Sequence, residues 1–582
     1  MAESCRQFPG KGTVVEKRGR EHSPRSSTPR IHREPQFWIV LLVALAIHFP
    51  RLTTLTIRGE ESRRAVIARE MLHTGDWIVP RTQGQVRLSR PPLQNWLIAG
   101  LMLLTGETSA WSVRLPGLIS TVLTVALVYW SARQHLSTTG AVGAAAAYAS
   151  FAQVLEQGRL GETEPVFTLL VAASLLLWYR GWTAGWPRSL VWAVGGACAG
   201  LAMLTKGLQS PLYFFGPVWV YLIISRQQRA LAEPAHGVGL AVFSMVVGAW
   251  QIPFVVQMGW ENGWMIYFWN VANRFHDHRL TTFATHLLTY PLAIGVVCLA
   301  PWSLLLLAFG LRRLRAALGA RRDQALFLTL SVLVTFPSVW LPPEARPRYF
   351  MPLFPCIAVL VGVAMEVLRE HLGDESGRLW RLFLRLASGC LALTAGVLLF
   401  SSWWLPPSPY RVPVGLAVLT AGALVVLAAV VWTASRLSSP AGMERAVLAI
   451  AAGLGVLYVG PIITIQKQRS ENLPAAMATL QSRLPESARL VSFDHVHHLF
   501  LYYYGREVPL LPWPQTAEDV PPDVDYFCVH LAHPGPPRLP FAWEEVATLS
   551  VDRNHHPVPK ERVVIGRRTD RLNLSAVNRQ RG

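Results

Sequence analysis

Apolar segments long enough to cross a lipid bilayer recur along most of this chain. A helix needs about 20 apolar residues to span about 30 Å of hydrocarbon, and such runs return repeatedly between residues 37 and 464. The mean hydropathy is +0.30, and 51% of the residues are hydrophobic whereas 15% are charged. A chain of 582 residues with this composition is too apolar and too long for one soluble core. The sequence therefore predicts a mainly α-helical, polytopic membrane protein.

About 13 spans are expected, and each is an apolar run bounded by polar residues or by Gly and Pro. They lie near 37–55, 114–132, 139–154, 165–180, 189–205, 209–225, 237–257, 286–308, 325–341, 349–367, 384–404, 412–435 and 445–464. The basic, polar residues 1–36 have no apolar period, which predicts a disordered cytoplasmic tail. No small-residue cleavage site follows the run from Phe37, so this tail is not expected to be a cleavable signal peptide.

The distribution of arginines orients these spans in a cell inner (plasma) membrane. A net charge of +19 could indicate nucleic acid as a partner, but arginines beside apolar spans are better explained by orientation and anionic lipid. We therefore expect membrane lipids and no nucleic acid among the partners. With the tail inside, the Arg-rich segments from Arg312 and Arg369 also lie inside. The first loop, the polar segments at 156–164, 259–285 and 342–349, and the C-terminus then all lie outside.

The first outer loop, residues 56–113, carries carboxylates and arginines directly beside the bilayer. Charged groups kept in such a place are usually functional, so this loop is predicted to be the floor of an active site. Residues 62–72 have the pattern of a short interfacial helix. Residues 93–105 follow a Pro-Pro pair and are too short to span, which predicts a second interfacial or re-entrant helix.

The composition changes after residue 466, which divides the chain into a transmembrane domain (37–466) and a C-terminal domain (467–582). The segment RLVSFDHVHHLFLYYYGREVPLL has the pattern of a strand, a short helix and a second strand. DYFCVHL and ERVVIGRR have the pattern of further strands. We expect a small extracytoplasmic α/β domain on the face that carries the active site.

Several motifs in the same order along the chain resemble one family. The run EESRRAVIAREMLHTGDWIVPRTQGQVRLSRPPLQNWL, with WSVRLPGL after it, is similar to the first outer loop of polytopic C-type glycosyltransferases of the family 39 type. The branch it most resembles holds the protein O-mannosyltransferases and the lipid A aminoarabinose transferases. GRLGETEP, TKGLQSP, NVANRF, APW and RPRYFMPLFP follow in the family's order. The resemblance extends over residues 37–370.

This resemblance implies an inverting transferase. It would move a hexose or pentose from a polyprenyl phosphate to an extracytoplasmic acceptor, which could be a lipid A-like glycolipid, a glycan or a protein. A carboxylate would take the acceptor's proton, and fixed cations would stabilise the departing phosphate. The residues at catalytic positions are Glu60, Glu61, Arg63 and Glu164, with Glu60 preferred as the base. The residues at the donor phosphate are Arg90, Lys206, Arg274, Arg348 and Tyr349.

Three departures from the family pattern concern these residues. Glu60-Glu61 stands where the family has Asp-Glu, and Glu164 stands where it has Asp. Each added methylene moves a carboxylate, and a displacement of about 1 Å can reduce a rate on the order of a hundredfold. The base assignment between Glu60 and Glu61 therefore stays open. Arg90 replaces a Lys and retains its charge.

Each of these residues also has a purely structural interpretation. Glu60 and Glu61 could be solvated carboxylates paired with the arginines that follow them. Glu164 could interact with the N-terminus of the next helix. Arg114 and Lys206 could anchor the ends of spans in lipid head groups.

No cofactor is expected. His495, His497 and His498 invite a zinc interpretation, but no further ligand follows at a suitable spacing. The segment 276–278 (His-Asp-His) follows Arg274, and a divalent metal ion there is a minor alternative, because the relatives are not expected to need one.

Two other functions are alternatives to the transferase. A non-catalytic carrier or flippase of lipid-linked sugars on the same scaffold would keep the cations and could dispense with the carboxylates. A secondary transporter is disfavoured, because the two halves show no repeat and the polar groups cluster outside the spans.

Overall fold

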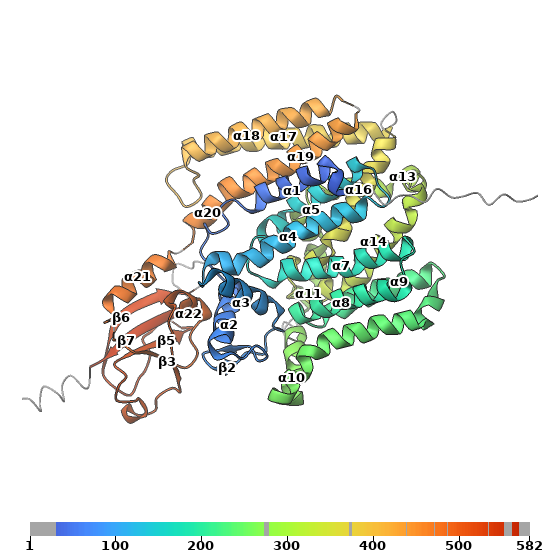
Figure 1. Cartoon of the computed structure of the whole chain (residues 1–582). Coiled ribbons are helices and arrows are strands. Elements are labelled where there is room, and N and C mark those ends of the chain that lie inside the picture. The colour runs from blue at the N-terminus through green and yellow to red at the C-terminus, as the bar shows by residue number, and fades with distance from the viewer. Residues whose placement is uncertain are drawn as a thin grey trace, which may run out of the picture.

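The computed structural model describes residues 31–272, 279–371, 375–437, 439–470, 472–485, 487–533, 535–551 and 561–569. They form a large bundle of helices with a small mixed sheet at one end, next to helices α2 and α3 (Figure 1). The mainly helical membrane fold is therefore confirmed. Of the predicted disordered tail, residues 1–30 lie outside the described residues. Ile31–Arg33 form a 3₁₀ turn, and helix α1 begins at Pro35.

The thirteen predicted spans all fall on helices. Among the described residues, ten helical runs are long and apolar enough to cross a membrane, and α1, α5 and α9 occupy the other three predicted segments. The helices of the membrane part are α1 (Pro35–His48), α4 (Ala110–Ala132), α5 (Thr138–Ser150), α6 (Ala152–Gln157), α7 (Thr163–Thr183), α8 (Arg188–Lys206), α9 (Gln209–Ile224), α10 (Pro234–Ala272), α11 (Leu280–Leu292), α12 (Ser303–Leu306), α13 (Arg312–Ala316), α14 (Arg322–Thr335), α15 (Pro337–Trp340), α16 (Phe354–Glu370), α17 (Glu375–Trp404), α18 (Val414–Ala434), α19 (Pro440–Leu457) and α20 (Ile463–Gln468).

Helix α10 corrects one expectation. The predicted outer loop at 259–285 is helical at both ends, because α10 continues to Ala272 after a break at Gly259 and α11 begins at Leu280. Gly259 has φ 83°, a left-handed conformation that glycine adopts without steric cost. The glycine therefore turns the helix where a loop was predicted.

Helices α5 and α16 form the centre of the bundle, where small residues permit close backbone approach. A Cβ built on Gly362 of α16 would lie 2.6 Å from the carbonyl oxygen of Gly140 in α5. No side chain fits there. Alanine and glycine along α5 thus serve the same purpose as small-residue helix interfaces in other membrane proteins.

The first loop folds over the end of this bundle. It contains α2 (Glu60–Thr74), a hairpin of β1 (Arg81–Thr82) and β2 (Gln85–Val86), and α3 (Leu93–Thr105). The predicted helix at 62–72 lies within α2, and the short apolar segment at 93–105 is α3. Helix α2 packs against α3 and against α22 of the C-terminal domain.

The C-terminal residues contain α21 (Leu473–Arg483), β3 (Leu490–Phe493), α22 (His498–Tyr504), β4 (Leu510–Leu511), β5 (Tyr526–Leu531), β6 (Trp543–Ser550) and β7 (Arg562–Arg568). The strand order is β4-β3-β5-β7-β6, with β4, β3 and β5 parallel and β5, β7 and β6 antiparallel. The predicted strand–helix–strand unit is β3-α22-β4. Helix α21 and strand β6 were not predicted.

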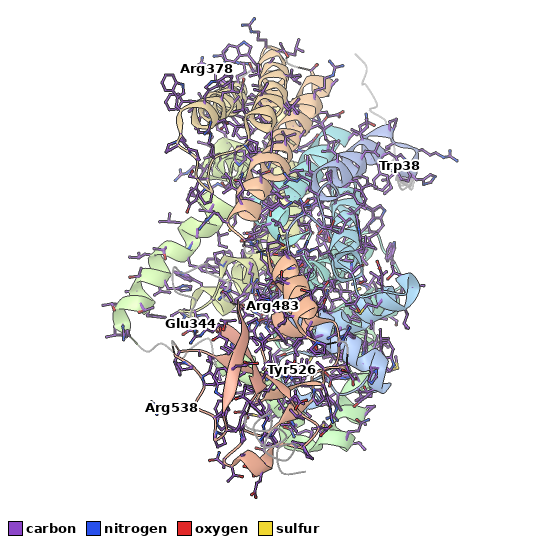
Figure 2. All side chains as sticks on the ribbon, turned by 90° about the vertical axis from the view of Figure 1, so that its left-hand side faces the viewer. Trp38, Glu344, Arg378, Arg483, Tyr526 and Arg538 are labelled. Atoms are coloured by element: carbon purple, nitrogen blue, oxygen red, sulfur yellow. The ribbon has the colours of Figure 1, made fainter. Side chains whose placement is uncertain are left out.

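The hairpin of the first loop fixes the sheet in place. The side chain of Gln83, at the hairpin tip, donates to Ser492 Oγ at 2.8 Å and to the carbonyl of Val508 at 3.0 Å, and it accepts from the Val496 amide at 3.1 Å. Glu344 lies toward the end of the molecule that carries the sheet, whereas Trp38 and Arg378 lie toward the opposite end (Figure 2). The polar turn at 342–349 and the C-terminal domain therefore share one end of the bundle.

Candidate active site

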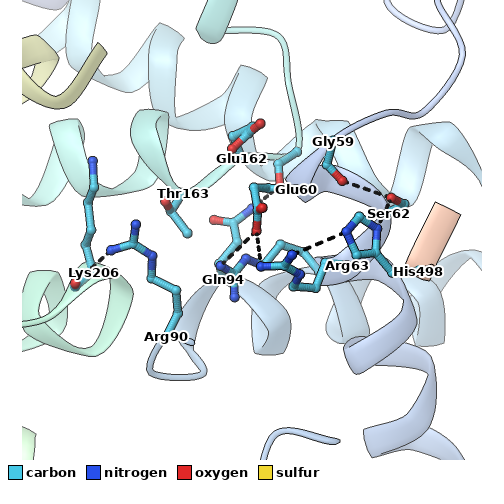
Figure 3. Close-up of polar contacts among 12 residues, drawn as sticks. Gly59, Glu60, Ser62, Arg63, Arg90, Gln94, Glu162, Thr163, Lys206 and His498 are labelled. Atoms are coloured by element: carbon cyan, nitrogen blue, oxygen red, sulfur yellow. Dashed lines mark hydrogen bonds and ion pairs between the residues drawn. The ribbon is translucent and has the colours of Figure 1, made fainter. Parts of the chain in front are cut away.

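A charged cavity of about 200 Å³ lies where the first loop meets the end of the bundle. Four segments that are distant in sequence converge on it: α2, the segment before α3, the start of α7, and the 3₁₀ segment Pro347–Leu353 with the residue before it. Its lining residues are Glu60, Arg63, Arg64, Ser89, Arg90, Glu162, Thr163, Glu164, Arg346, Arg348 and Tyr349. Figure 3 shows Glu60 beside Arg63 on α2, and Arg90 directed at the backbone oxygen of Lys206, the last residue of α8. Residues predicted from three separate motifs thus line this cavity.

Glu60 begins α2 and faces this cavity. Its Oε2 lies 2.9 Å from Arg63 Nη1 and 3.8 Å from Arg64 Nη2, because residues three and four positions apart share a helix face. The preceding Gly59 has φ 60°, which allows the chain to turn directly into the helix. The positive end of the helix dipole favours a negative charge at this position. The Glu60 side chain remains 22% exposed.

Glu61, by contrast, is held in a buried ion pair. Its two oxygens accept from Nε and Nη2 of Arg114 at 2.8 and 2.9 Å, and the Gly161 amide donates to Oε1 at 2.8 Å. Burial acts to raise the pKa of Glu61, but the charge and hydrogen bonds of Arg114 outweigh it and hold that pKa below its usual value. Both side chains are only 1% exposed.

Arg114 also closes the start of the first loop. Its guanidinium donates to the carbonyls of Leu52, Leu55 and Thr56 at 2.7 to 3.1 Å. Neither Glu61 nor Arg114 lines the cavity. Arg114 is buried against Glu61, where the sequence suggested an anchor in lipid head groups.

Two further carboxylates enter the cavity from the N-terminus of α7, where Glu162 precedes the helix and Glu164 lies in its first turn. Glu164 lies 3.3 Å from Lys206 Nζ and 3.6 Å from Arg348 Nε, and Glu162 lies 3.3 Å from Arg348 Nη1. Burial, together with the nearby charge of Glu164, raises the pKa of Glu162 to about 7. Glu162 was not singled out from the sequence, although the spacing Glu-Thr-Glu placed it two residues from a predicted site residue.

The predicted cationic side chains differ in whether they line the cavity or lie buried behind it. Arg90 lines the cavity and donates to the Lys206 carbonyl at 3.1 Å. The Lys206 side chain is fully buried behind the cavity, 4.9 Å from the ring centre of Tyr349. Arg348 and Tyr349 line the cavity directly. Arg274 and the neighbouring segment 276–278 lie outside the described residues.

Arg64 and Arg346 are cavity residues that sequence reasoning did not assign to the site. Arg64 is 3% exposed, and its Nε and Nη1 have no hydrogen-bond partner among the described residues. Burial lowers the pKa of Arg64 to about 10, so it still carries a positive charge near neutral pH. A buried guanidinium with unsatisfied donors is costly in the absence of an anion. The four-residue spacing from Glu60 was a signal that could have placed Arg64 on the same helix face.

The histidines of the C-terminal domain do not form a metal site in the described residues, where no group of three or more His, Cys, Asp or Glu side chains is arranged to hold a metal ion. His498 contacts Ser62 and Arg63 of α2, whereas His497 lies 3.7 Å from Glu561.

The fold and this cavity define a class: a polytopic helical membrane protein with carboxylates and guanidinium groups gathered at one end of its bundle. Residues 89–252 match the family described as dolichyl-phosphate-mannose-protein mannosyltransferase. This match agrees with the resemblance to family 39-type glycosyltransferases that the motifs of the chain indicate.

Individual relatives agree with this family. The chain is 31% identical to an undecaprenyl phosphate-alpha-4-amino-4-deoxy-L-arabinose arabinosyl transferase of Pseudomonas aeruginosa (strain UCBPP-PA14), over 62% of this chain and 65% of that protein. It is 29% identical to a second such transferase, of Pseudomonas fluorescens (strain Pf-5), over 62% of this chain and 61% of that protein. The aligned part thus spans less than two thirds of the length of these relatives.

The fold is similar to that of ArnT from Cupriavidus metallidurans bound to undecaprenyl phosphate. The TM-score is 0.64 at 19% sequence identity, and the match covers 91% of this chain and 97% of that one. The same protein in the apo state matches with a TM-score of 0.64 at 18% identity. This likeness shows that the bundle and the C-terminal domain share the ArnT architecture.

Proposed function

We propose that this protein is an inverting glycosyltransferase that moves a sugar from a polyprenyl phosphate to an acceptor outside the cytoplasm. The observation that carries this proposal is the cavity, in which one accessible carboxylate, Glu60, lies among guanidinium groups from separate segments. The relatives are named for an undecaprenyl-phosphate-linked aminopentose, so that donor is the first to test. A lipid A-like glycolipid is the first acceptor to test, before a glycan or a protein.

The proposed reaction is a single displacement. An acceptor oxygen attacks the anomeric carbon while the bond from that carbon to the phosphate oxygen breaks, and Glu60 takes the acceptor's proton. The polyprenyl phosphate leaves as an anion, which Arg64, Arg90 and Arg348 are placed to stabilise. No step in this scheme requires a metal ion or another cofactor, and transfer should therefore persist in a chelator.

The side of the membrane follows from charge. The cavity and the sheet share one end of the bundle, and the Arg-rich segments from Arg312 and Arg369 favour placing the other end in the cytoplasm. We therefore assign the cavity and the C-terminal domain to the outer face of the inner membrane.

The direct test compares envelope lipids and glycoproteins, by mass spectrometry, from cells with and without this chain. A sugar-sized mass difference on one acceptor class is expected only in cells that contain it. The purified protein with the undecaprenyl-phosphate aminopentose and that acceptor should then reproduce the transfer. Identical envelope profiles, together with no transfer from any polyprenyl-phosphate sugar, would contradict the proposal.

Replacing Arg64 tests the phosphate site. Arg64→Met is expected to weaken donor binding about tenfold or more, because a charge-assisted hydrogen bond contributes about 1.5–3 kcal/mol. The dissociation constant of the donor for the purified protein is the quantity to measure. Arg81→Gln, which removes a cation of the same loop outside the cavity, is the matched control. Equal affinities for all three proteins would show that Arg64 does not contact the donor.

Glu162 should make donor binding depend on pH. Its pKa of about 7 means that the cavity gains one negative charge as the pH rises through neutrality. Affinity for an anionic donor should therefore fall about tenfold between about pH 6 and about pH 8, the scale expected for one nearby charge. In Glu162→Gln this part of the pH dependence should disappear, as measured by donor binding across the same range. A wild-type affinity that is independent of pH would refute this assignment.

A further inference from the structure

His498 brings the C-terminal domain into contact with the first turn of α2. It is the first residue of α22, is 8% exposed, and faces two residues of α2. Its Nδ1 lies 2.8 Å from Ser62 Oγ, and its Nε2 lies 3.4 Å from Arg63 Nη2. The other terminal nitrogen of Arg63, Nη1, is the one paired with Glu60 at 2.9 Å (Figure 3). One guanidinium thus bridges the proposed base and a histidine that lies 438 positions further along the chain.

The hydrogen bonds at the two ring nitrogens match a neutral imidazole. Ser62 Oγ donates to the carbonyl of Gly59 at 2.9 Å, so its oxygen is available to accept from His498 Nδ1–H. With the proton on Nδ1, the lone pair on Nε2 accepts from Arg63. When the imidazole is neutral, each of these three hydrogen bonds therefore has one donor and one acceptor. Protonation would place a second N–H and a positive charge against the guanidinium.

We infer that His498 is a positioning residue for the transferase: as a neutral acceptor it holds Arg63 in place beside Glu60. This inference rests on the proposed function, because it concerns the base of that reaction. The C-terminal domain therefore contributes to the geometry of the catalytic loop as well as to the outer surface. Turnover should require a neutral His498, and the wild type should lose its advantage over a His498 variant as the pH falls.

Other titratable groups near this ring must be separated from it. Arg63 faces it from α2, and Glu60 lies behind Arg63. Within the C-terminal domain, the ring centre of His497 lies 4.2 Å from the ring centre of His498. His497 in turn faces Glu561 and the ring of His530. The useful quantity is thus the ratio of wild-type to variant turnover, in which titrations of unchanged groups largely cancel.

The experiment measures kcat, donor KM and thermal unfolding for full-length His498→Asn and His498→Gln across a pH series. Asparagine lacks an atom at the Nε2 position, and its kcat should fall about 10- to 100-fold on the alkaline side, with donor KM little changed. The wild-type to variant ratio should approach one on the acid side. Glutamine can return an acceptor toward Arg63 and should recover part of the loss.

The matched control is His530→Gln, which alters a histidine of strand β5 in the same domain, and wild-type values are expected for it. If His498→Asn does not fold, His498→Gln and Ser62→Ala, which removes the partner of Nδ1, carry the test. Unchanged kcat, or a loss that is equal at every pH, would overturn the inference while leaving the proposed function intact. A wild-type protein without turnover would overturn the proposed function, and this inference with it.

Discussion

Glu60→Gln is expected to abolish most sugar transfer without weakening donor binding. The amide has nearly the shape of the carboxylate but cannot take the acceptor's proton, and loss of a general base typically costs about 10²–10⁴-fold in rate. Its neighbours Arg63 and Arg64 remain available to hold an anionic donor. The measurements are single-turnover transfer and donor dissociation constant for the same purified protein. A lower kcat without a matching change in affinity would identify Glu60 as a group that acts in the transition state.

Glu70→Gln is the matched control for that experiment. Glu70 lies on the same helix, but its carboxylate accepts from the Gly84 amide and lies outside the cavity. It should retain transfer within about twofold, the scale of a surface substitution. Should Glu60→Gln transfer sugar at the wild-type rate, Glu60 would not be the base. A carrier of lipid-linked sugars, which needs no base, would then become the better hypothesis.

Removing one partner of the Glu61–Arg114 pair is expected to destabilise the protein strongly. Arg114→Met leaves a buried carboxylate without its counter-charge and three backbone carbonyls without a donor. Breaking a buried pair in this way costs about 3–5 kcal/mol. The unfolding temperature of the purified protein in detergent should fall by several degrees, with a lower yield of folded protein. The loss of activity should follow the loss of folded protein, because Arg114 does not line the cavity.

Arg489→Met offers the comparison. Arg489 is paired with Asp523, both side chains are 56% exposed, and such surface pairs contribute about 0–1 kcal/mol. Its unfolding temperature should remain close to that of the wild type. The double variant Glu61→Gln, Arg114→Met should recover part of the stability, because it leaves no isolated charge. If Arg114→Met unfolds at the wild-type temperature, the Glu61–Arg114 ion pair does not stabilise the folded protein.

Much of the fold could be predicted because its signals are local. Apolar length and composition determine where helices such as α16 lie, and the polar interval after α1 marks the loop that covers the site. The helix at α2 and the strand–helix–strand unit of β3, α22 and β4 follow from periodicity alone. Strand β6 has no such signal, because WEEVATLS carries charged residues within a half-exposed edge strand.

The cavity was predicted only in part, because convergence is not a local property. Glu60, Arg90, Glu164 and Arg348 belong to motifs with a recognisable order, and they meet in space. Arg64 lies beside Arg63 in sequence, and only its burial distinguishes it from a surface charge. Likewise, nothing near His498 in the sequence indicates that its ring faces a helix more than four hundred residues earlier.

The buried ion pair and hydrogen bond of Glu61 have a consequence for how substrates enter. Because one carboxylate joins the first loop to Arg114 of α4 and to the Gly161 amide, this loop and the turn before α7 must shift together or not at all. A hinged opening of the first loop would have to break the interactions of Glu61 with Arg114 and with the Gly161 amide. We therefore expect a long isoprenoid to slide in from the flank of the bundle, within the plane of the lipid.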